Sequence, residues 1–390
     1  MIEFDAKPTL AGTNIKIVGI GGAGGNAINT MIDNNLFGVE FIAANTDNTD
    51  LAKSKAKMKL QIGKKLTRGL GTGANPEFGK QSAEESKDEI KAHLEGADMV
   101  FIAAGMGGGT GTGGAPVIAK IARELGILTL GIVSTPFISE GLRRKQNAEE
   151  GIKNLREYVD TLIIIPNEKL KEIYSQMGIL DAFHTADSVL FEAAKAVSDI
   201  INLSGYINVD FADVKTVMQN MGYAHMGTGL AEGENRAIHA ARAAINNPLL
   251  SDISLEGSQS LLINITAGSD MKMSEFDEVS NVIVSETGSA ANIIMGLIMD
   301  ENMTGKISVT LIATGLKRDE RDRVIDFPKI PEPISYSNEQ PNEEINDIIS
   351  RLDLSRNKED LNIDTRATKE EPTKFNPHRT DIPSFLKALD

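Results

Sequence analysis

The most informative part of the sequence is a glycine-rich run, Ala104-Gly105-Met106-Gly107-Gly108-Gly109-Thr110-Gly111-Thr112-Gly113-Gly114. It follows the apolar residues Met99 to Ala103 and leads into a helical pattern that starts near Pro116, so we expect a strand, a tight turn and a helix N-terminus. Because few side chains stand in the way, successive backbone N–H groups and the positive end of the helix can converge on an anion. The run therefore predicts a phosphate-binding turn, whereas a flexible linker is the ordinary alternative for a glycine run.

Composition limits the class of protein. The 390 residues suggest roughly two domains, and the formal net charge of −15 argues against nonspecific nucleic-acid binding. The chain has no cysteine, which excludes disulfides and thiolate chemistry. Its N-terminus lacks the order of a signal peptide, and charged residues such as Lys120 and Arg123 interrupt its best apolar stretch. We therefore expect a cytoplasmic protein with no nucleic-acid partner and no direct membrane insertion.

Apolar runs alternate with helical patterns along the chain. We expect strands at 15–20, 39–44, 98–104, 127–134 and 161–166, and helices at 24–34, 117–125, 148–158 and 181–203. Further strands are expected at 260–267, 281–284 and 306–314, in a second domain that ends near Leu316. The alternation predicts an α/β fold, with a parallel sheet covered by helices on both faces and ligands at the carboxyl ends of the strands.

The composition changes after Arg318. Prolines arrive among Glu, Asn, Asp, Ser and Lys, and this composition predicts a disordered linker. The final stretch, Asp381 to Lys387, gathers Ile, Phe and Leu and could become ordered on a partner. A frayed terminus is the ordinary alternative.

A second glycine cluster, Gly19-Ile20-Gly21-Gly22-Ala23-Gly24-Gly25-Asn26, follows the first expected strand. It contains the G-x-G-x-x-G of dinucleotide-binding proteins, and Asp47 could bind the ribose in an NAD-type dehydrogenase. A dinucleotide site needs only one such turn, however, so two turns indicate a longer phosphate chain. No Gly-Lys pair in the sequence has the spacing of a P-loop.

Several motifs in order resemble the bacterial FtsZ family of tubulin homologues. The motifs are Gly107–Gly113, Arg68–Pro76, Pro136–Arg144, Asn208–Asp213 and the tail Asp381–Leu386. The resemblance runs from about Ile15 to Leu316 and resumes at the tail. It implies a tubulin-like GTPase that binds GTP or GDP, holds Mg²⁺ mainly through the phosphates, and assembles head to tail at the mid-cell division ring.

The resemblance also implies a division of the chain into segments. These are an N-terminal extension (1–14), a GTP-binding domain (15–180), a central helix (181–204), an activation loop with a smaller α+β domain (205–316), a disordered linker (317–377) and a partner-binding peptide (378–390). Through Asp381, Ile382, Pro383, Phe385 and Leu386, this peptide would bind membrane-anchoring and regulatory division proteins.

The resemblance assigns nucleotide-binding roles to residues at several expected strand ends. Phosphate-binding residues would be Gly21, Gly22, Ala23, Gly24, Gly25 and Asn26 on one side and Gly107, Gly108, Gly109, Thr110 and Gly111 on the other. Glu140 and Arg144 would hold the ribose and the phosphate edge, although their i,i+4 spacing equally suits a surface salt bridge. By resemblance, Asn167 and Asp187 read guanine and Phe183 stacks on it; a solvated Asp187 is the alternative.

Asp210 and Asp213 are the expected catalytic residues. In FtsZ-like proteins their loop enters the nucleotide site of the next subunit, where a carboxylate can orient the attacking water. Their i,i+3 spacing at a helix start also suits simple capping, which would leave a nucleotide-binding scaffold without turnover. Tyr206 stands where the family more often has an aliphatic residue, and His184 lies beside Phe183 with its contact to nucleotide undecided.

Overall fold

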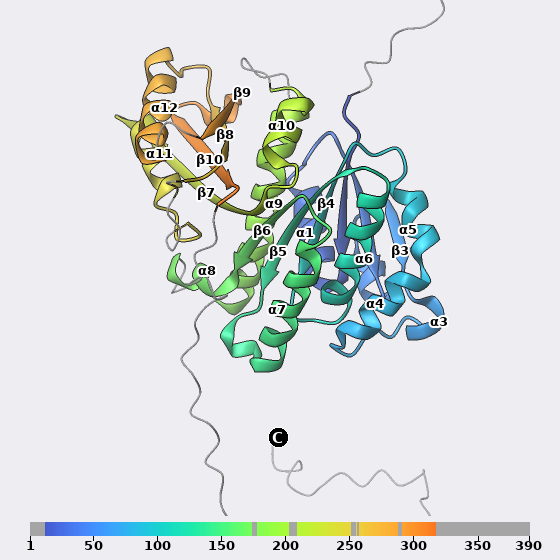
Figure 1. The fold of residues 1–390 in the computed structure, drawn as a ribbon. Helices are drawn as coiled ribbons and strands as arrows, with labels where there is room; N and C mark the ends of the chain where they lie inside the picture. Colours follow the sequence, from blue (N-terminus) through green and yellow to red (C-terminus); the bar gives the residue numbers. More distant parts are fainter. Residues whose placement is uncertain are drawn as a thin grey trace, which may run out of the picture. The chain divides into compact units, whose positions relative to one another are not determined.

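The computed structural model describes residues 12–173, 178–202, 209–250, 255, 257–287 and 291–316 (Figure 1). Their strands form one ten-stranded sheet in the order β3-β2-β1-β4-β5-β6-β7-β10-β8-β9. The linker and tail predictions fall outside the described residues, as do Tyr206 and Asn208.

The first part of the sheet is parallel, as the alternation predicts. Its strands are β1 (Ile15–Ile20), β2 (Val39–Asn45), β3 (Met58–Gln61), β4 (Met99–Gly105), β5 (Leu128–Thr135) and β6 (Thr161–Pro166). Its helices are α1 (Gly21–Asp33), α2 (Asn48–Lys53), α3 (Lys64–Thr67), α4 (Pro76–Glu85), α5 (Lys87–Leu94), α6 (Thr110–Glu124), α7 (Leu142–Arg156) and α8 (Asn167–Ile173), with the 3₁₀ turn η1 (Ile138–Glu140). The apolar residues of β1 and β4 alternate between two hydrophobic clusters, so each face of the sheet packs against its own layer of helices.

The second part of the sheet is mixed. β7 (Gly222–Glu232) is parallel to β6 and antiparallel to β10 (Lys306–Thr314), which is antiparallel to β8 (Ser260–Ala267). β9 (Asn292–Met299) is parallel to β8. The remaining elements are α9 (Ile179–Asn202), α10 (Phe211–Met218), α11 (Arg236–Ile245), α12 (Met273–Thr287) and the 3₁₀ turn η2 (Glu301–Met303). A third cluster of buried apolar residues lies between α11, α12 and strands β8 to β10.

The long helix α9 has contacts with both parts of the sheet. Asn202 donates its side-chain N–H to Gly38 O before β2, and Asn264 of β8 donates to Ala196 O of α9. After α9 the chain reaches α10, where Met218 O accepts a hydrogen bond from Thr161 at the start of β6. α10 therefore lies at the amino ends of the parallel strands.

Several sequence predictions differ from the structure. The helix expected at 148–158 is α7, which begins six residues earlier, at Leu142. The expected strand at 281–284 is wrong, because these residues belong to α12, whose buried residues Val279, Ile283 and Thr287 repeat every four positions. Helix α6 begins at Thr110 and not near Pro116, so the last five residues of the glycine-rich run, Thr110 to Gly114, belong to the helix. Helix α1 likewise begins at Gly21 instead of 24. The sequence interpretation also omitted β3, β7 and β9.

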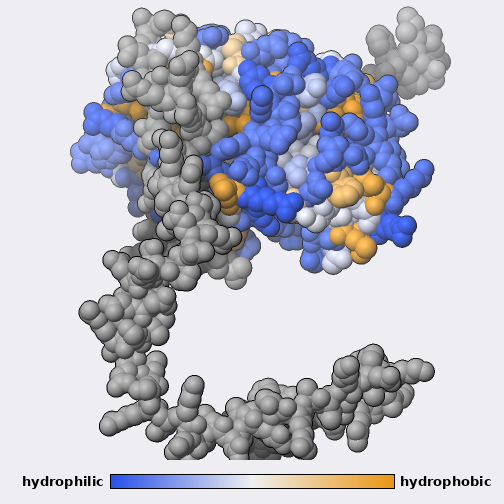
Figure 2. All heavy atoms as spheres, turned by 60° about the horizontal axis from the view of Figure 1, so that its bottom comes forward, coloured by the Kyte–Doolittle hydropathy of each residue, from blue (hydrophilic) through white to orange (hydrophobic). Residues whose placement is uncertain are grey.

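The surface of the described part is mostly hydrophilic on the face drawn in Figure 2, where apolar side chains form small, separate patches. Among the described residues, no helix is both long enough and apolar enough to cross a membrane.

Candidate nucleotide-binding site

Two helix N-termini meet at the carboxyl ends of β1 and β4. A Cβ placed on Gly21, the first residue of α1, would lie 3.0 Å from the backbone N of Gly111 in the first turn of α6. Neither N-cap residue, Ile20 nor Gly109, caps its helix with a side chain, and neither first turn contains an acidic residue. The first backbone N–H groups of both helices have no partner within their helix, and both positive dipole ends converge here. This arrangement suits an anion with several charged oxygens.

The glycines of the two glycine-rich segments, 19–25 and 105–114, which we call the glycine loops, fall into two groups. At Gly19, Gly24 and Gly109 an added Cβ would lie within 2.4 Å of a neighbouring oxygen, so packing explains the missing side chain. At Gly25 and Gly108 an added Cβ would meet nothing within 4 Å. Packing within the described chain therefore does not require glycine at these two positions, whereas a ligand seated against the backbone would.

Threonine hydroxyls fix the start of α6. Thr110 Oγ1 lies 2.7 Å from Thr46 Oγ1 after β2 and 3.4 Å from Thr72 Oγ1. Thr112 Oγ1 accepts a hydrogen bond from Gly107 N, which has a φ of 105°. These bonds hold the loop between β4 and α6 in one conformation.

Asp47, which a dehydrogenase would use to bind the ribose, caps a helix. Its carboxylate caps α2, accepting hydrogen bonds from Thr49 N at 2.7 Å and Asp50 N at 3.3 Å. Both hydrogen bonds go to Oδ1, so this oxygen serves the backbone of α2. This contact argues for the longer-phosphate interpretation of the glycine loops.

Glu140 and Arg144 follow β5 and pair with each other. Arg144 Nη1 lies 2.5 Å from Glu140 Oε2, and Glu140 Oε1 accepts a hydrogen bond from Phe137 N at 2.9 Å. The arginine side chain is about half exposed and can reach solvent or a ligand. Both alternatives from the sequence, a ligand contact and a surface ion pair, are compatible with this geometry.

Asn167 directly follows β6, and Asp187 is a partly buried carboxylate on α9. Asn167 is only 5% exposed, yet its Oδ1 has no hydrogen-bond partner. Asp187 lies on α9 near the end that packs against α8, and burial raises the pKa of its carboxyl to about 7, opposed in part by His184. A buried carbonyl oxygen without a partner is costly unless a ligand satisfies it.

Phe183 supplies an aromatic surface one turn before Asp187. Its ring is packed edge-on against Phe137, with 5.3 Å between centroids, and the side chain stays 42% exposed. Lys171 of α8 lies 5.3 Å from the centre of the Phe137 ring. The contact links the loop after β5 with α9 and leaves ring surface exposed to solvent.

Ser134 is a polar residue of this site that sequence reasoning missed. The buried residues Leu130 and Ile132 of β5 and Ile163 and Ile165 of β6 share one hydrophobic cluster with α9, so by strand alternation Ser134 lies on that face of the sheet. Its Oγ is 3.7 Å from the position of a Cβ on Gly105. Strand alternation continued to the carboxyl end of β5 could have identified it.

Asp210 and Asp213 lie away from these residues. Asp210 caps α10 by accepting a hydrogen bond from Asp213 N at 2.8 Å, and both residues are exposed. About 22 Å of helix separate Asp187 from the end of α9 at 1.5 Å per residue, and α10 follows that end. One copy of the chain therefore does not bring these carboxylates to its own glycine loops.

The described residues contain no group of three or more His, Asp or Glu side chains arranged to hold a metal ion. The fold and site together are those of an α/β protein that binds a nucleotide at the ends of parallel strands.

Comparison with known proteins identifies the class more closely. Residues 14–175 match the model of the GTPase domain of the Tubulin/FtsZ family, and residues 222–317 match the C-terminal domain of the FtsZ family. The cell division protein FtsZ of Coxiella burnetii is 44% identical over 96% of both chains. That of Pseudomonas aeruginosa is 54% identical over 77% of both chains.

A solved structure leads to the same family. An empty FtsZ dimer from M. jannaschii has a TM-score of 0.75 and 43% identity, and the match covers 82% of this chain and 95% of that one. The chain belongs to the FtsZ family of tubulin-like cell division GTPases. The resemblance noted from the motifs is thereby confirmed, as is the tubulin-like fold.

Proposed function

We propose that the chain binds GTP at the two glycine loops and hydrolyses it only when a second copy supplies Asp210 and Asp213. Head-to-tail repetition of this contact does not close on itself and generates a filament. The filament would form the division ring at mid-cell in the cytoplasm. The observation that carries the proposal is the separation of the two half-sites, which lie at opposite ends of the parallel strands.

The phosphate-binding part of the proposal rests on the backbone. The uncapped N-termini of α1 and α6 would donate N–H groups to the phosphate oxygens, and the open space at Gly25 and Gly108 would admit them. Mg²⁺ bound through the phosphates would neutralise charge that develops at the reacting phosphoryl group. Three further residues assigned by resemblance, Gly22, Ala23 and Asn26, lie in the first turns of α1, and Gly107 lies in the turn between β4 and α6.

The base-binding part rests on three side chains. An ionised Asp187 would accept the N–H groups of guanine, a donor pattern that adenine lacks. The buried Asn167 Oδ1, which lacks a partner, would gain one from the ligand. Phe183 would cover the ring with its exposed face.

In the catalytic part of the proposal, the second copy supplies the carboxylate that orients the attacking water. A carboxylate of its Asp213 or Asp210 would orient a water for in-line attack on the γ-phosphorus, while backbone donors stabilise the negative charge. The domain boundaries, the tail peptide and its division-protein partners belong to this proposal as well. The dehydrogenase alternative is not favoured, because the chain belongs to a GTPase family and its Asp47 caps α2.

Phosphate release measured against protein concentration tests the proposal. We expect specific activity to rise steeply with concentration, together with light scattering, because each site needs a neighbour. Asp213→Ala should lower turnover about a hundredfold while GTP binding persists. Asp88→Ala is the matched control, since Asp88 is also an exposed acid in a helix first turn, that of α5. Activity strictly proportional to enzyme, or normal turnover by Asp213→Ala, would refute the shared site.

A further inference from the structure

His184 occupies a position that no role has yet explained. It lies on α9 one turn before Asp187, next to Phe183, and its side chain is exposed. Residues at i and i+3 of a helix are neighbours on its surface, with Cβ atoms about 5–6 Å apart. The edge-on contact of Phe183 with Phe137 fixes this turn of α9 in place. His184 is therefore held beside the carboxylate that is proposed to read guanine.

Few charged residues lie on the elements that pack against the α9 helix around Asp187. The strands β5, β6, β8 and β9 carry no charged residue, and α1 contributes only Asp33, which is paired with Lys55.

The neighbouring helices contribute mainly paired charges. On α8 the charged residues with described side chains are Glu168, Lys169 and Lys171, and Glu168 pairs with Lys171. α10 contributes Asp213 and Lys215 near the far end of α9, where Asp199 pairs with Lys195. On α9 itself, Asp181 and Glu192 lie further from Asp187 along the helix than His184 does.

The proposed recognition of guanine depends on the ionisation state of Asp187, which its neighbour His184 affects. A carboxyl group accepts two hydrogen bonds from guanine only when it is ionised. Burial opposes that ionisation at Asp187, and the charge of His184 favours it. Histidine is also the side chain whose charge ordinarily changes between pH 5 and 8.

We propose that His184 is a positioning residue for guanine recognition, whose positive charge one helical turn away keeps Asp187 in the ionised form that binds the base. The proposal rests on the proposed role of Asp187. It makes guanine affinity depend on pH through a pair of residues on one helix face. His184 itself need not touch the nucleotide.

Calorimetric titration of the full-length, nucleotide-free chain with GDP tests this, because GDP does not bring triphosphate-driven assembly into the measurement. For His184→Gln we expect GDP affinity about two- to fourfold below wild type at pH 6.5 and within about twofold of it at pH 8.5, where Asp187 ionises without help. His184→Lys, which keeps a positive charge, should restore wild-type affinity at pH 6.5. His239→Gln on α11, another exposed histidine, is the matched control and should leave the pH profile unchanged.

The double variant separates this proposal from the function on which it rests. Asp187→Asn should bind GDP weakly at every pH, and adding His184→Gln to it should change nothing further. If Asp187→Asn is weak but His184→Gln follows the wild-type profile, the role of His184 is refuted and base reading stands. An equal loss at all pH values in His184→Gln would indicate a packing role and also refute it. Wild-type affinity in Asp187→Asn would refute the base-reading function itself.

Discussion

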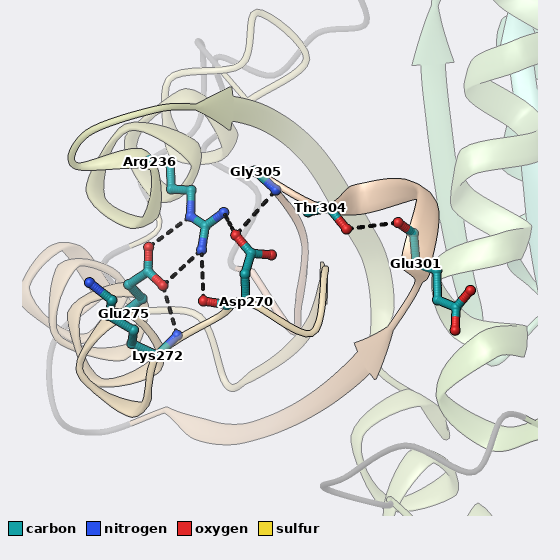
Figure 3. A network of polar contacts seen from close by, with 7 residues as sticks. All are labelled: Arg236, Asp270, Lys272, Glu275, Glu301, Thr304 and Gly305. Carbon is teal, nitrogen blue, oxygen red and sulfur yellow. Dashed lines mark hydrogen bonds and ion pairs between the residues drawn. The ribbon is translucent and has the colours of Figure 1, made fainter.

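The carboxyl ends of β1, β4 and β6 and the Arg236 cluster beside α12 differ in whether their polar groups have partners within the chain. At the glycine loops, two helix N-termini are uncapped and the Asn167 Oδ1 has no partner. In the Arg236 cluster the guanidinium is paired with two carboxylates: Arg236 donates to Glu275 at 2.7 and 3.0 Å and to Asp270 at 2.6 Å (Figure 3).

The contrast separates binding from structure. Arg236 is 7% exposed by its side chain, and its partners tie the first turn of α11 to the connection between β8 and α12 and to Gly305 before β10. The hydrogen bonds of the Arg236 guanidinium all go to Glu275 and Asp270. The first N–H groups of α1 and α6 have no partner within their own helix and no side-chain cap, and such donors suit a phosphate.

Removing the arginine should produce the largest change in stability. Arg236→Met leaves Glu275 and Asp270 without their partner, and we expect the free energy of unfolding to fall by about 3 kcal/mol. GDP affinity of the folded fraction should stay within about twofold of wild type, since the cluster lies outside the site. Urea unfolding and calorimetry measure the two quantities. A large loss of affinity with unchanged stability would overturn the assignment of Arg236 to structure.

Adjacent glycines in α1 offer a sharper contrast. An alanine Cβ at position 24 would lie 2.4 Å from Ala103 O, so Gly24→Ala should lower the free energy of unfolding by about 1–3 kcal/mol. At position 25 the Cβ meets nothing, and alanine is the better helix former by about 1 kcal/mol. Gly25→Ala should therefore fold at least as well, while GDP affinity falls about tenfold, or about 1.4 kcal/mol, if phosphate occupies that space. If Gly25→Ala is stable and its GDP affinity is unchanged, the proposed contact between a phosphate and α1 is refuted.

The stability contributions of Asp187 and of the Arg236 cluster should change with pH in opposite directions. Burial raises the pKa of Asp187 from 3.8 to about 7, so its contribution to stability is complete below pH 3.8 and is lost as pH rises through 7. The hydrogen bonds from Arg236 lower the pKa values of Glu275 and Asp270, so their contribution is present at neutral pH and is lost as pH falls through their lowered values.

Unfolding of the nucleotide-free chain measures the Asp187 side of this difference. Relative to wild type, Asp187→Asn should gain roughly 1–3 kcal/mol of stability between pH 5 and pH 8, because it removes a carboxyl that must ionise while buried. Glu275→Gln should instead lose stability relative to wild type as the pH rises from 3 to 6. If both variants followed the wild-type curve at a constant offset, the electrostatic contrast would be incorrect.

The sequence predicted most strands in both parts of the sheet, because they are short apolar runs. β1, β6, β8 and β10 begin and end at the expected residues. The prediction failed where tertiary packing outweighs local preference. The five residues of the glycine-rich run from Thr110 to Gly114 are poor helix formers in isolation, yet α6 starts at Thr110, because its small residues allow α4 to approach closely. Gly113 shows this directly, since a Cβ there would lie 1.8 Å from Pro76 O.

The site residues illustrate the same limit. Glycine spacing in the sequence identified the two turns at the ends of β1 and β4, and the i,i+4 spacing of Glu140 and Arg144 predicted their pairing. Sequence alone does not distinguish Gly24, which packing requires, from Gly25, which it does not. Nor does it reveal that Asn167 is buried without a partner for its Oδ1. Both facts depend on elements that are distant in the chain.

The most direct test of the shared site mixes two defective copies. Asp213→Ala keeps the glycine loops but lacks the acid, whereas Gly108→Asp keeps the acid and places a carboxylate in the open space that the phosphates would fill. GTP turnover is measured for each variant alone and for their mixture at the same total concentration. The account predicts that the mixture turns over GTP well above the average of the two separate rates. A mixture rate equal to that average would contradict it.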